Sequence, residues 1–281
     1  MKTKFTKNNI ILFLSLVVVS LLFIPKQIVN ERFNNKKLTF CICFFGVIPR
    51  SIKFTIESIK KNIFDVLTDS NISFDTYVHN MKVDTFLSKR AGDHNVTVDN
   101  NLCKLLPATE FSEINQIDFD NNYDWKKISK YGYTEGDINT LQNAIRQLYS
   151  VKQVTKLWDN KKNTNYDYYI YLRPDLLYIN KIDIHTILQN INKKNVLLTP
   201  HWHKSGGIND RIYMGNKNVI KIFGNRFDEA YNMTEKYKSV YHAEKHMKYI
   251  AEKYNIKTVD INLKGKRVRT NGIPKEENFT L

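Results

Sequence analysis

The sequence predicts an α/β protein in which helices flank a central sheet. Residues 166–179, YDYYIYLRPDLLYI, begin with an aromatic and β-branched run, which is typical of a parallel strand buried on both faces. Residues 38–47, LTFCICFFGV, have the same character, and isoleucines at helical spacing follow them within residues 52–63. A long helix is predicted for residues 134–158, where apolar residues form one stripe and either Thr134 or Asp137 is available as the N-cap. Alternating strands and helices indicate the α/β class.

The composition allows a packed core and favours anionic partners. Of the 281 residues, 42% are hydrophobic, which suits one large or two small domains. Lysine and arginine (43) outnumber aspartate and glutamate (28), and the net charge of +15 suits nucleotides, polyphosphate or a membrane surface. The basic residues are mostly lysines scattered along the chain, so we expect no nucleic-acid partner. The three cysteines show neither a disulfide framework nor a zinc-finger spacing.

The N-terminus carries a membrane-targeting pattern. Residues 1–9 contain three lysines, and residues 10–25 are apolar apart from two serines and the closing proline. Because no small-x-small cleavage pattern follows, we expect an uncleaved signal anchor rather than a cleaved signal peptide. The predicted organisation is a cytosolic tail, this anchor, a polar stem (26–37) and a domain across the membrane (38–281). This is the type II single-pass orientation, in a membrane of the ER or Golgi kind or a viral or host membrane.

The first predicted strand leads into a candidate anion site. It ends at Gly46, and Arg50 follows just before the predicted helix. Backbone N–H groups and the dipole at a helix N-terminus favour a phosphate, with which Arg50 could pair. The alternative is an ordinary strand–helix turn without a ligand.

The strand within residues 166–179 delivers two charged residues, Arg173 and Asp175, at its far end. In open α/β sheets, ligands bind just beyond the carboxyl ends of the strands, where these residues are expected. Charged groups that follow an apolar strand need a partner, and a metal-bound diphosphate would be one. The alternative is a solvated Arg–Asp pair at a strand end.

Residues 201–216, HWHKSGGINDRIYMGN, form another dense group of polar side chains. They follow a predicted strand at 195–199 and lead into the strand RIYMG. Glycines permit backbone conformations closed to other residues, so we expect a shaped loop that could hold a small acceptor molecule. A solvated connection is the alternative.

The C-terminal part predicts two helices, a strand and a basic patch. The helices are expected at 218–232 and 239–254, and the strand at 256–261. Residues 264–269, KGKRVR, could close over phosphates or remain a solvated edge. Between residues 80 and 130 the pattern loosens into polar loops with short apolar runs.

The order of these features resembles the nucleotide-sugar glycosyltransferases of the GT-A type. Within them, it is most similar to a membrane-anchored or viral-type group in which an aromatic strand runs into RPDL. The matching segments within residues 38–270 include FCICFFGVIPRS, NAIRQLYSVKQV, YDYYIYLRPDLLY, GGINDRIYMGN and AEKHMKYI. The resemblance implies a GT-A fold, with a Rossmann-like mixed sheet flanked by helices.

The resemblance also implies roles for single residues. In this family an acidic DxD element binds a divalent metal that bridges the donor diphosphate. Here the position reads RPD, which implies Mn²⁺ or Mg²⁺ on Asp175, with Arg173 where the first aspartate would stand. Arg50 would contact the nucleotide or diphosphate. Asp210 would be the catalytic or acceptor-binding group, with Glu244 as the alternative general base.

The activity implied by the resemblance is sugar transfer. The donor would be a nucleoside-diphosphate sugar, and the acceptor a hydroxyl group of a glycan, glycoprotein or glycolipid. Because the first aspartate of the DxD element is replaced, a catalytically inactive membrane protein that binds sugars or nucleotides on the same fold is the alternative. Nucleic-acid binding, a third hypothesis, has only the +15 charge in its favour.

Overall fold

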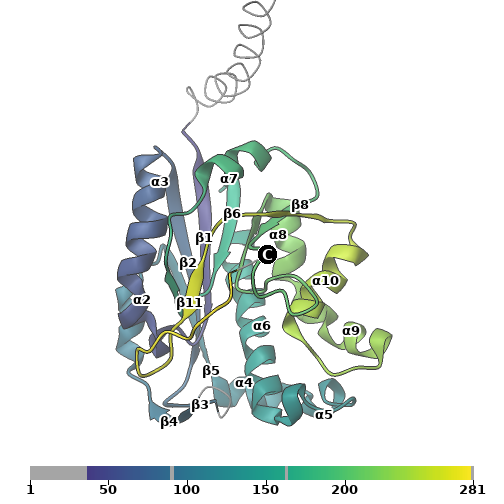
Figure 1. Ribbon diagram of the computed structural model, residues 1–281. Coiled ribbons are helices and arrows are strands. Elements are labelled where there is room, and N and C mark those ends of the chain that lie inside the picture. Colours follow the sequence, from purple (N-terminus) through teal and green to yellow (C-terminus); the bar gives the residue numbers. More distant parts are fainter. Residues whose placement is uncertain (1–36, 89–91, 162–163, 280–281) are drawn as a thin grey trace, which may run out of the picture. The chain divides into compact units, whose positions relative to one another are not determined.

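The computed structural model describes residues 37–88, 92–161 and 164–279, and Leu38–Leu281 form one compact unit (Figure 1). The predicted cytosolic tail and anchor, and nearly all of the stem, lie outside the described residues. Within the described ranges, no helix is long and apolar enough to cross a membrane.

The unit is built around a seven-stranded sheet of order β10-β8-β9-β6-β1-β2-β5. Strand β9 runs antiparallel to its neighbours β6 and β8, and every other neighbouring pair is parallel. The strands are β1 (Thr39–Gly46), β2 (Ser73–Lys82), β5 (Glu110–Asn115), β6 (Tyr168–Leu172), β8 (Val196–Thr199), β9 (Ile212–Gly215) and β10 (Lys257–Asp260). The prediction of an α/β protein with a mixed, Rossmann-like sheet flanked by helices is confirmed.

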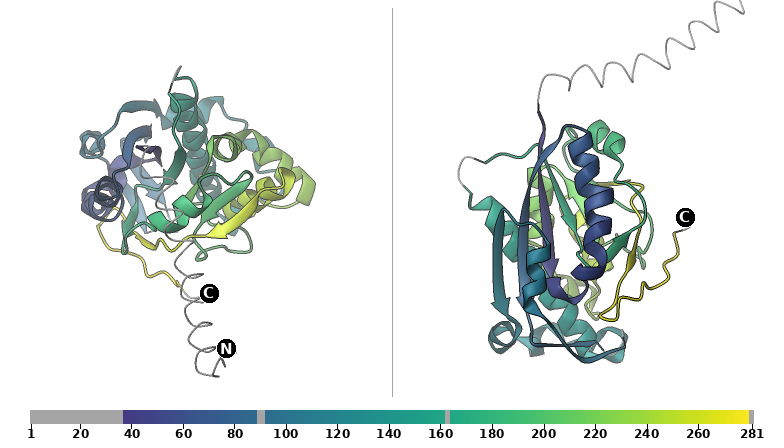
Figure 2. Two further views of the ribbon diagram at one scale, coloured as in Figure 1. Left: turned by 90° about the horizontal axis from the view of Figure 1, so that it is seen from above. Right: turned by 90° about the vertical axis from the view of Figure 1, so that its left-hand side faces the viewer.

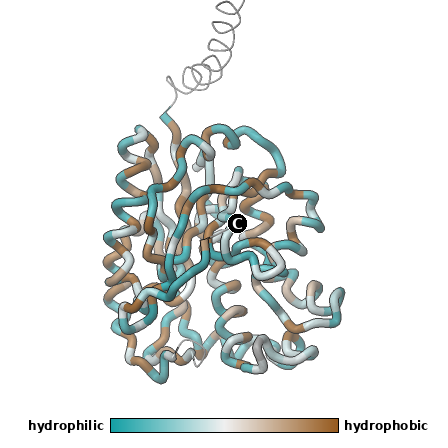
Figure 3. The backbone as a smooth tube through the Cα atoms, viewed as in Figure 1, coloured by the Kyte–Doolittle hydropathy of each residue, from teal (hydrophilic) through white to brown (hydrophobic). Residues whose placement is uncertain are grey.

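The two predicted apolar runs lie side by side in the middle of the sheet. Phe40 of β1 stands opposite Tyr168 of β6, and all of β6 and nearly all of β1 are buried. Successive strand side chains point to opposite faces. Phe45 therefore joins the core under α6 (Ile138–Asp159), whereas Phe44 meets Phe64 on the other face. Figure 3 shows the hydrophobic colouring of this central region.

Helices cover both faces of the sheet (Figure 2). The face of Phe44 carries α2 (Ile52–Ile59), the π-helical turn η2 (Lys60–Phe64) and α3 (Asp65–Asp69), which follow one another directly. The face of Phe45 carries α6, α8 (Lys217–Gly224) and α10 (Ala243–Lys253). The sheet is thus buried between two layers of helices, as the unbroken apolar runs of β1 and β6 indicate.

Several predicted boundaries shift. Of the two predicted N-cap residues, Asp137 caps α6 by accepting from the backbone N–H groups of Asn139 and Thr140, so the helix begins at residue 138 rather than 134. The helix predicted for 218–232 is divided into α8, the 3-10 turn η6 (Arg226–Glu229) and α9 (Ala230–Tyr237). The next helix begins at Ala243 rather than at residue 239.

The remaining elements are short. They are η1 (Ile48–Arg50), β3 (Thr85–Ser88), β4 (Asp93–Thr97), η4 (Asn100–Leu105), α4 (Gln116–Asn122), α5 (Trp125–Ile128), η5 (Thr134–Gly136), β7 (Leu176–Tyr178), α7 (Ile184–Asn190) and β11 (Gly265–Arg267).

The strand predicted within residues 166–179 is divided at the RPD sequence. Strand β6 ends at Leu172, and β7 pairs with β11 in a separate two-stranded sheet. Arg267 of β11 stands opposite Leu176. Pro174 has no backbone N–H to donate to a neighbouring strand, which favours the break here. The turn at residues 173–175 therefore lies at the carboxyl end of a central strand, beside the C-terminal strand.

Candidate active site

A cleft of about 250 Å³ lies at the carboxyl ends of β1 and β6. Its walls include the first half of α6, the loop before β9 and the start of α10. All five site residues singled out in the sequence line it: Arg50, Arg173, Asp175, Asp210 and Glu244. They come from four separate segments of the chain. The fold therefore gathers them where ligands of open α/β sheets bind.

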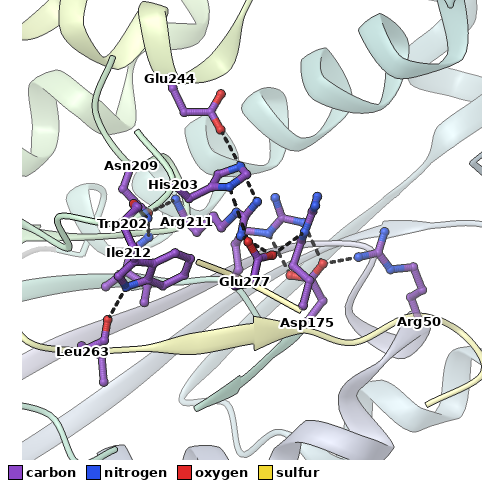
Figure 4. Close-up of polar contacts among 12 residues, drawn as sticks. Arg50, Asp175, Trp202, His203, Asn209, Arg211, Ile212, Glu244, Leu263 and Glu277 are labelled. Carbon is purple, nitrogen blue, oxygen red and sulfur yellow. Dashed lines mark hydrogen bonds and ion pairs between the residues drawn. The ribbon is translucent and has the colours of Figure 1, made fainter. Parts of the chain in front are cut away.

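The turn after β6 makes Asp175 the partner of two arginines. Arg173 donates to both carboxylate oxygens, at 2.8 Å from Nε and 2.7 Å from Nη2, and Arg50 donates to Oδ2 (Figure 4). Asp175 is only 4% exposed. Although burial acts to raise the pKa of Asp175, Arg173 and Arg50 hold it well below its usual range. Asp175 is thus a buried carboxylate with both oxygens engaged.

Hydrogen bonds from distant segments fix this turn. The carbonyl of Pro174 accepts from Oγ1 of Thr55 at 2.6 Å, which ties the turn to α2. The carbonyl of Asp175 accepts from the N–H of Val268 at 2.8 Å. Val268 in turn accepts from Oγ of Ser51 at 2.8 Å. These bonds hold the start of α2 and the C-terminal segment against the turn.

Six arginines line the cleft. The sixth, Arg146, is paired with Asp120, and we call the other five the arginine cluster: Arg50, Arg173, Arg211, Arg267 and Arg269. Arg211 is 1% exposed and Arg267 is 8% exposed. Burial, and after it the neighbouring arginines, lowers the pKa of Arg211 and that of Arg269 to about 10. Among the described residues, Nε of Arg50 and Nη2 of Arg267 have no hydrogen-bond partner. The cluster therefore has donors to offer an anion.

Glu244 lies at the start of α10 between two histidines. Its oxygens are 3.1 Å from Nε2 of His203 (Figure 4) and 3.2 Å from Nδ1 of His242. Although burial acts to raise the pKa of Glu244, the two histidines hold it well below its usual range. Burial acts to lower the pKa of His203, but Glu244 and Glu277 outweigh it and raise that pKa. Nη2 of Arg211 also contacts Nε2 of His203, so this ring nitrogen lies between a carboxylate and a guanidinium group.

The glycine-containing loop brings Asp210 to the cleft. Gly206 has a φ of +76°, which few residues other than glycine adopt. Gly207 lies so close to α10 that a Cβ atom there would overlap the backbone of Glu244, and the N–H of Ile208 donates to the Glu244 carbonyl at 3.0 Å. The two glycines thus have different roles, one conformational and one steric. Both hold the loop against the start of α10.

The C-terminal segment supplies a residue that sequence reasoning missed. The side chain of Glu277, 6% exposed, accepts from Nη1 of Arg211 at 2.8 Å and lies 3.4 Å from Nε of Arg267 and 3.5 Å from Nδ1 of His203. The carbonyl of Phe279 lies 2.9 Å from Nε2 of His201. The sequence here is polar and aperiodic, and no pattern in it points to these contacts. Arg267 and Arg269, by contrast, belong to the basic patch recognised at residues 264–269.

A divalent metal does not fit the side chains as they are arranged. Both oxygens of Asp175 already accept from guanidinium groups. Across residues 37–88, 92–161 and 164–279, no group of three or more His, Cys, Asp or Glu side chains could hold a metal ion.

We compared the sequence with protein-family models and with curated proteins. No protein-family model matches the chain, and no curated protein matches it significantly.

Proposed function

We propose that the protein is a GT-A-type glycosyltransferase that moves a sugar from a nucleoside-diphosphate sugar to an acceptor hydroxyl group. The observation that carries the proposal is the meeting of the arginine cluster with Asp210 and Glu244 in one cleft. In an inverting displacement, sugar transfer needs positive charge at the leaving diphosphate and a general base, such as a carboxylate, at the attacking hydroxyl. The mixed Rossmann-like sheet is the architecture that the resemblance implies.

In the proposed reaction, the acceptor oxygen attacks the anomeric carbon of the sugar while the bond from that carbon to the diphosphate oxygen breaks. The electron pair of that bond leaves with the diphosphate. Guanidinium groups of the arginine cluster would stabilise the growing negative charge, and Asp175 holds two of them in fixed positions. The acceptor proton passes to a carboxylate of the cleft.

Asp210 is the preferred proton acceptor. In the described part of the chain, the one hydrogen-bond partner of its side chain is Gln147, whose Nε2 lies 3.4 Å from Oδ2. Glu244, in contrast, has two histidine neighbours that keep its pKa low. The Asp210 carboxylate has fewer hydrogen-bonding neighbours, so its oxygens are more available to an acceptor hydroxyl group, and Glu244 ranks second.

The predicted N-terminal anchor belongs to the same proposal. It would hold the cleft at a membrane, where glycan, glycoprotein and glycolipid acceptors are available. The described residues begin after this segment, so the proposal for it rests on the sequence of residues 10–25.

The test is an assay of the full chain against a panel of nucleotide sugars, with release of the nucleoside diphosphate as the readout. We expect one donor to be consumed, and Asp210→Asn to lower the rate by about 10²–10⁴-fold. Glu244→Gln tests the second carboxylate. Glu252→Gln, exposed on the same helix α10, is the matched control and should leave the rate unchanged.

Two other outcomes would contradict the proposal. If a nucleotide sugar raises the unfolding temperature but is never consumed with any acceptor, the protein is a binding protein on this fold. If no nucleotide sugar binds, the cleft serves another anion.

A further inference from the structure

The arginine cluster has more donors than its neighbours satisfy. Its direct ion pairs are with Asp175 and Glu277, and Asp93 acts on Arg50 and Arg269 from a greater distance. Nε of Arg50 and Nη2 of the nine-tenths buried Arg267 remain without partners among the described residues. Buried donors without hydrogen-bond partners favour a ligand that has several acceptor oxygens.

Asp175 serves these arginines rather than a cation. It accepts three hydrogen bonds from Arg50 and Arg173, so its negative charge holds their guanidinium groups in place. A positioned guanidinium presents its N–H groups in a planar fork that matches phosphate oxygens. The guanidinium groups of the arginine cluster already supply the positive charge that a metal would bring to a diphosphate.

We propose that the arginine cluster binds the diphosphate of the donor without a divalent cation. The proposal rests on the proposed function for the identity of the ligand, and on the contacts of Asp175 for the absence of a metal requirement. Arg267 supplies a free donor at the cluster, and Asp175 is a positioning residue.

The experiment titrates the full chain with inorganic pyrophosphate and with nucleoside diphosphates in a calorimeter, first with a chelator and then with Mn²⁺. We expect binding in the chelator, with an affinity that Mn²⁺ leaves essentially unchanged. Arg267→Gln should weaken binding about tenfold or more. Lys266→Gln, the neighbouring position on β11, pairs with exposed Glu276 and is the matched control, with no expected effect.

The outcomes separate this inference from the proposed function. Binding that needs Mn²⁺ overturns the inference, and consumption of a nucleotide sugar with Mn²⁺ would then leave the function standing. Binding of pyrophosphate in the chelator supports the inference even if no nucleotide sugar is consumed, in which case the function falls. No binding of either anion under any condition overturns both.

A different observation concerns the C-terminal segment. Residues 275–279 form neither helix nor strand, yet Glu277 is placed against Arg211, Arg267 and His203. The ring of Phe279 packs edge-on against Trp202 at 5.3 Å. These contacts hold the segment against three residues of the cleft wall, Arg211, Arg267 and His203.

We infer that Glu277 is an internal anion that occupies part of the arginine cluster until the donor diphosphate displaces it. Its carboxylate accepts from the same guanidinium groups that a phosphate would use. Displacement would free Nη1 of Arg211 and Nε of Arg267, and would let the segment move away from the cleft.

Paired variants of adjacent residues test this inference. Glu277→Gln removes the competing charge and should tighten pyrophosphate binding about tenfold. Glu276→Gln, an exposed neighbour, should leave the affinity unchanged. Phe279→Ala, which removes the ring from Trp202, should tighten binding in the same direction without changing any charge. An unchanged or weaker affinity in both Glu277→Gln and Phe279→Ala would overturn the inference.

Discussion

Asp175 is the residue on which the charge arrangement of the cleft depends most. Its removal leaves the guanidinium groups of Arg50 and Arg173 buried without their carboxylate. Breaking one side of a buried ion pair costs about 3–5 kcal/mol. Asp175→Asn should therefore lower the free energy of unfolding by about that amount, measured by urea denaturation. Asp228→Asn, which removes an exposed partner of Lys152, should cost about 1 kcal/mol or less.

An equal loss of stability in Asp175→Asn and Asp228→Asn would contradict this role for Asp175. Pyrophosphate offers a second check, because an anion that binds the cluster should restore part of the stability lost in Asp175→Asn.

The lowered pKa of Glu277 predicts that the stability of the protein depends on pH. Although burial acts to raise its pKa, His203 and Arg211 lower the pKa of Glu277 to about 2 in the folded protein, against about 4.3 in the unfolded chain. Because the folded pKa is depressed, the stabilisation is present above pH about 4.3 and is lost as the pH falls through about 2. The stability difference between wild type and Glu277→Gln, measured by denaturation from pH 6 to pH 2, should therefore shrink toward acid. A difference that stays constant would contradict the ion pairs of Glu277.

The sequence singled out five residues that line the cleft, but it did not predict their contacts. Arg50, Arg173 and Asp175 follow apolar strands, which is a local signal. Their meeting is not local, since 125 residues separate Arg50 from Asp175. No sequence pattern identified Glu277 as a site residue, because a glutamate in a polar C-terminal segment gives the same pattern whether its carboxylate is solvated or buried.

At the scale of elements, the glycine loop and α10 form one unit. Gly207→Ala would push a methyl group into the backbone of Glu244. We expect a loss of stability by overpacking of about 1–3 kcal/mol, and a drop in transfer rate because Glu244 and Asp210 move apart. Urea denaturation and the donor-release assay would measure the two effects.

Gly206→Ala is the comparison for that variant. Its Cβ atom would approach only the end of the Lys245 side chain, at 3.9 Å, but its φ of +76° costs about 1–2 kcal/mol. Strain without a clash should lower stability and leave the catalytic rate nearly intact. Equal effects of the two substitutions on the rate would contradict the steric contact between the loop and α10.

The elements best predicted from the sequence are those buried on both faces. Strands β1 and β6 consist almost wholly of apolar residues, so their composition alone identifies them. The edge strand β5 alternates between partly buried and exposed residues. It lies between residues 80 and 130, where the sequence pattern predicted polar loops with short apolar runs. The division of residues 166–179 into β6 and β7 depends on pairing with β11, which no local pattern encodes.

At the scale of the whole molecule, the class of fold followed from alternating strands and helices, but the strand order did not. The antiparallel course of β9 and its place between β6 and β8 bring the Asp210 loop beside the RPD turn. That placement unites the arginine cluster and the two candidate bases. Reasoning from single motifs therefore selected residues that the fold gathers in one cleft, without the geometry that connects them.

The claim that the cleft holds a nucleoside-diphosphate donor is tested most directly by comparing nucleoside diphosphates with their monophosphates in calorimetric titrations of the full chain. Because the arginine cluster can contact both phosphates, one diphosphate should bind about tenfold or more tightly than its monophosphate. Asp175→Asn should remove that preference. Equal affinity for the two nucleotides, or binding of neither, would contradict the claim.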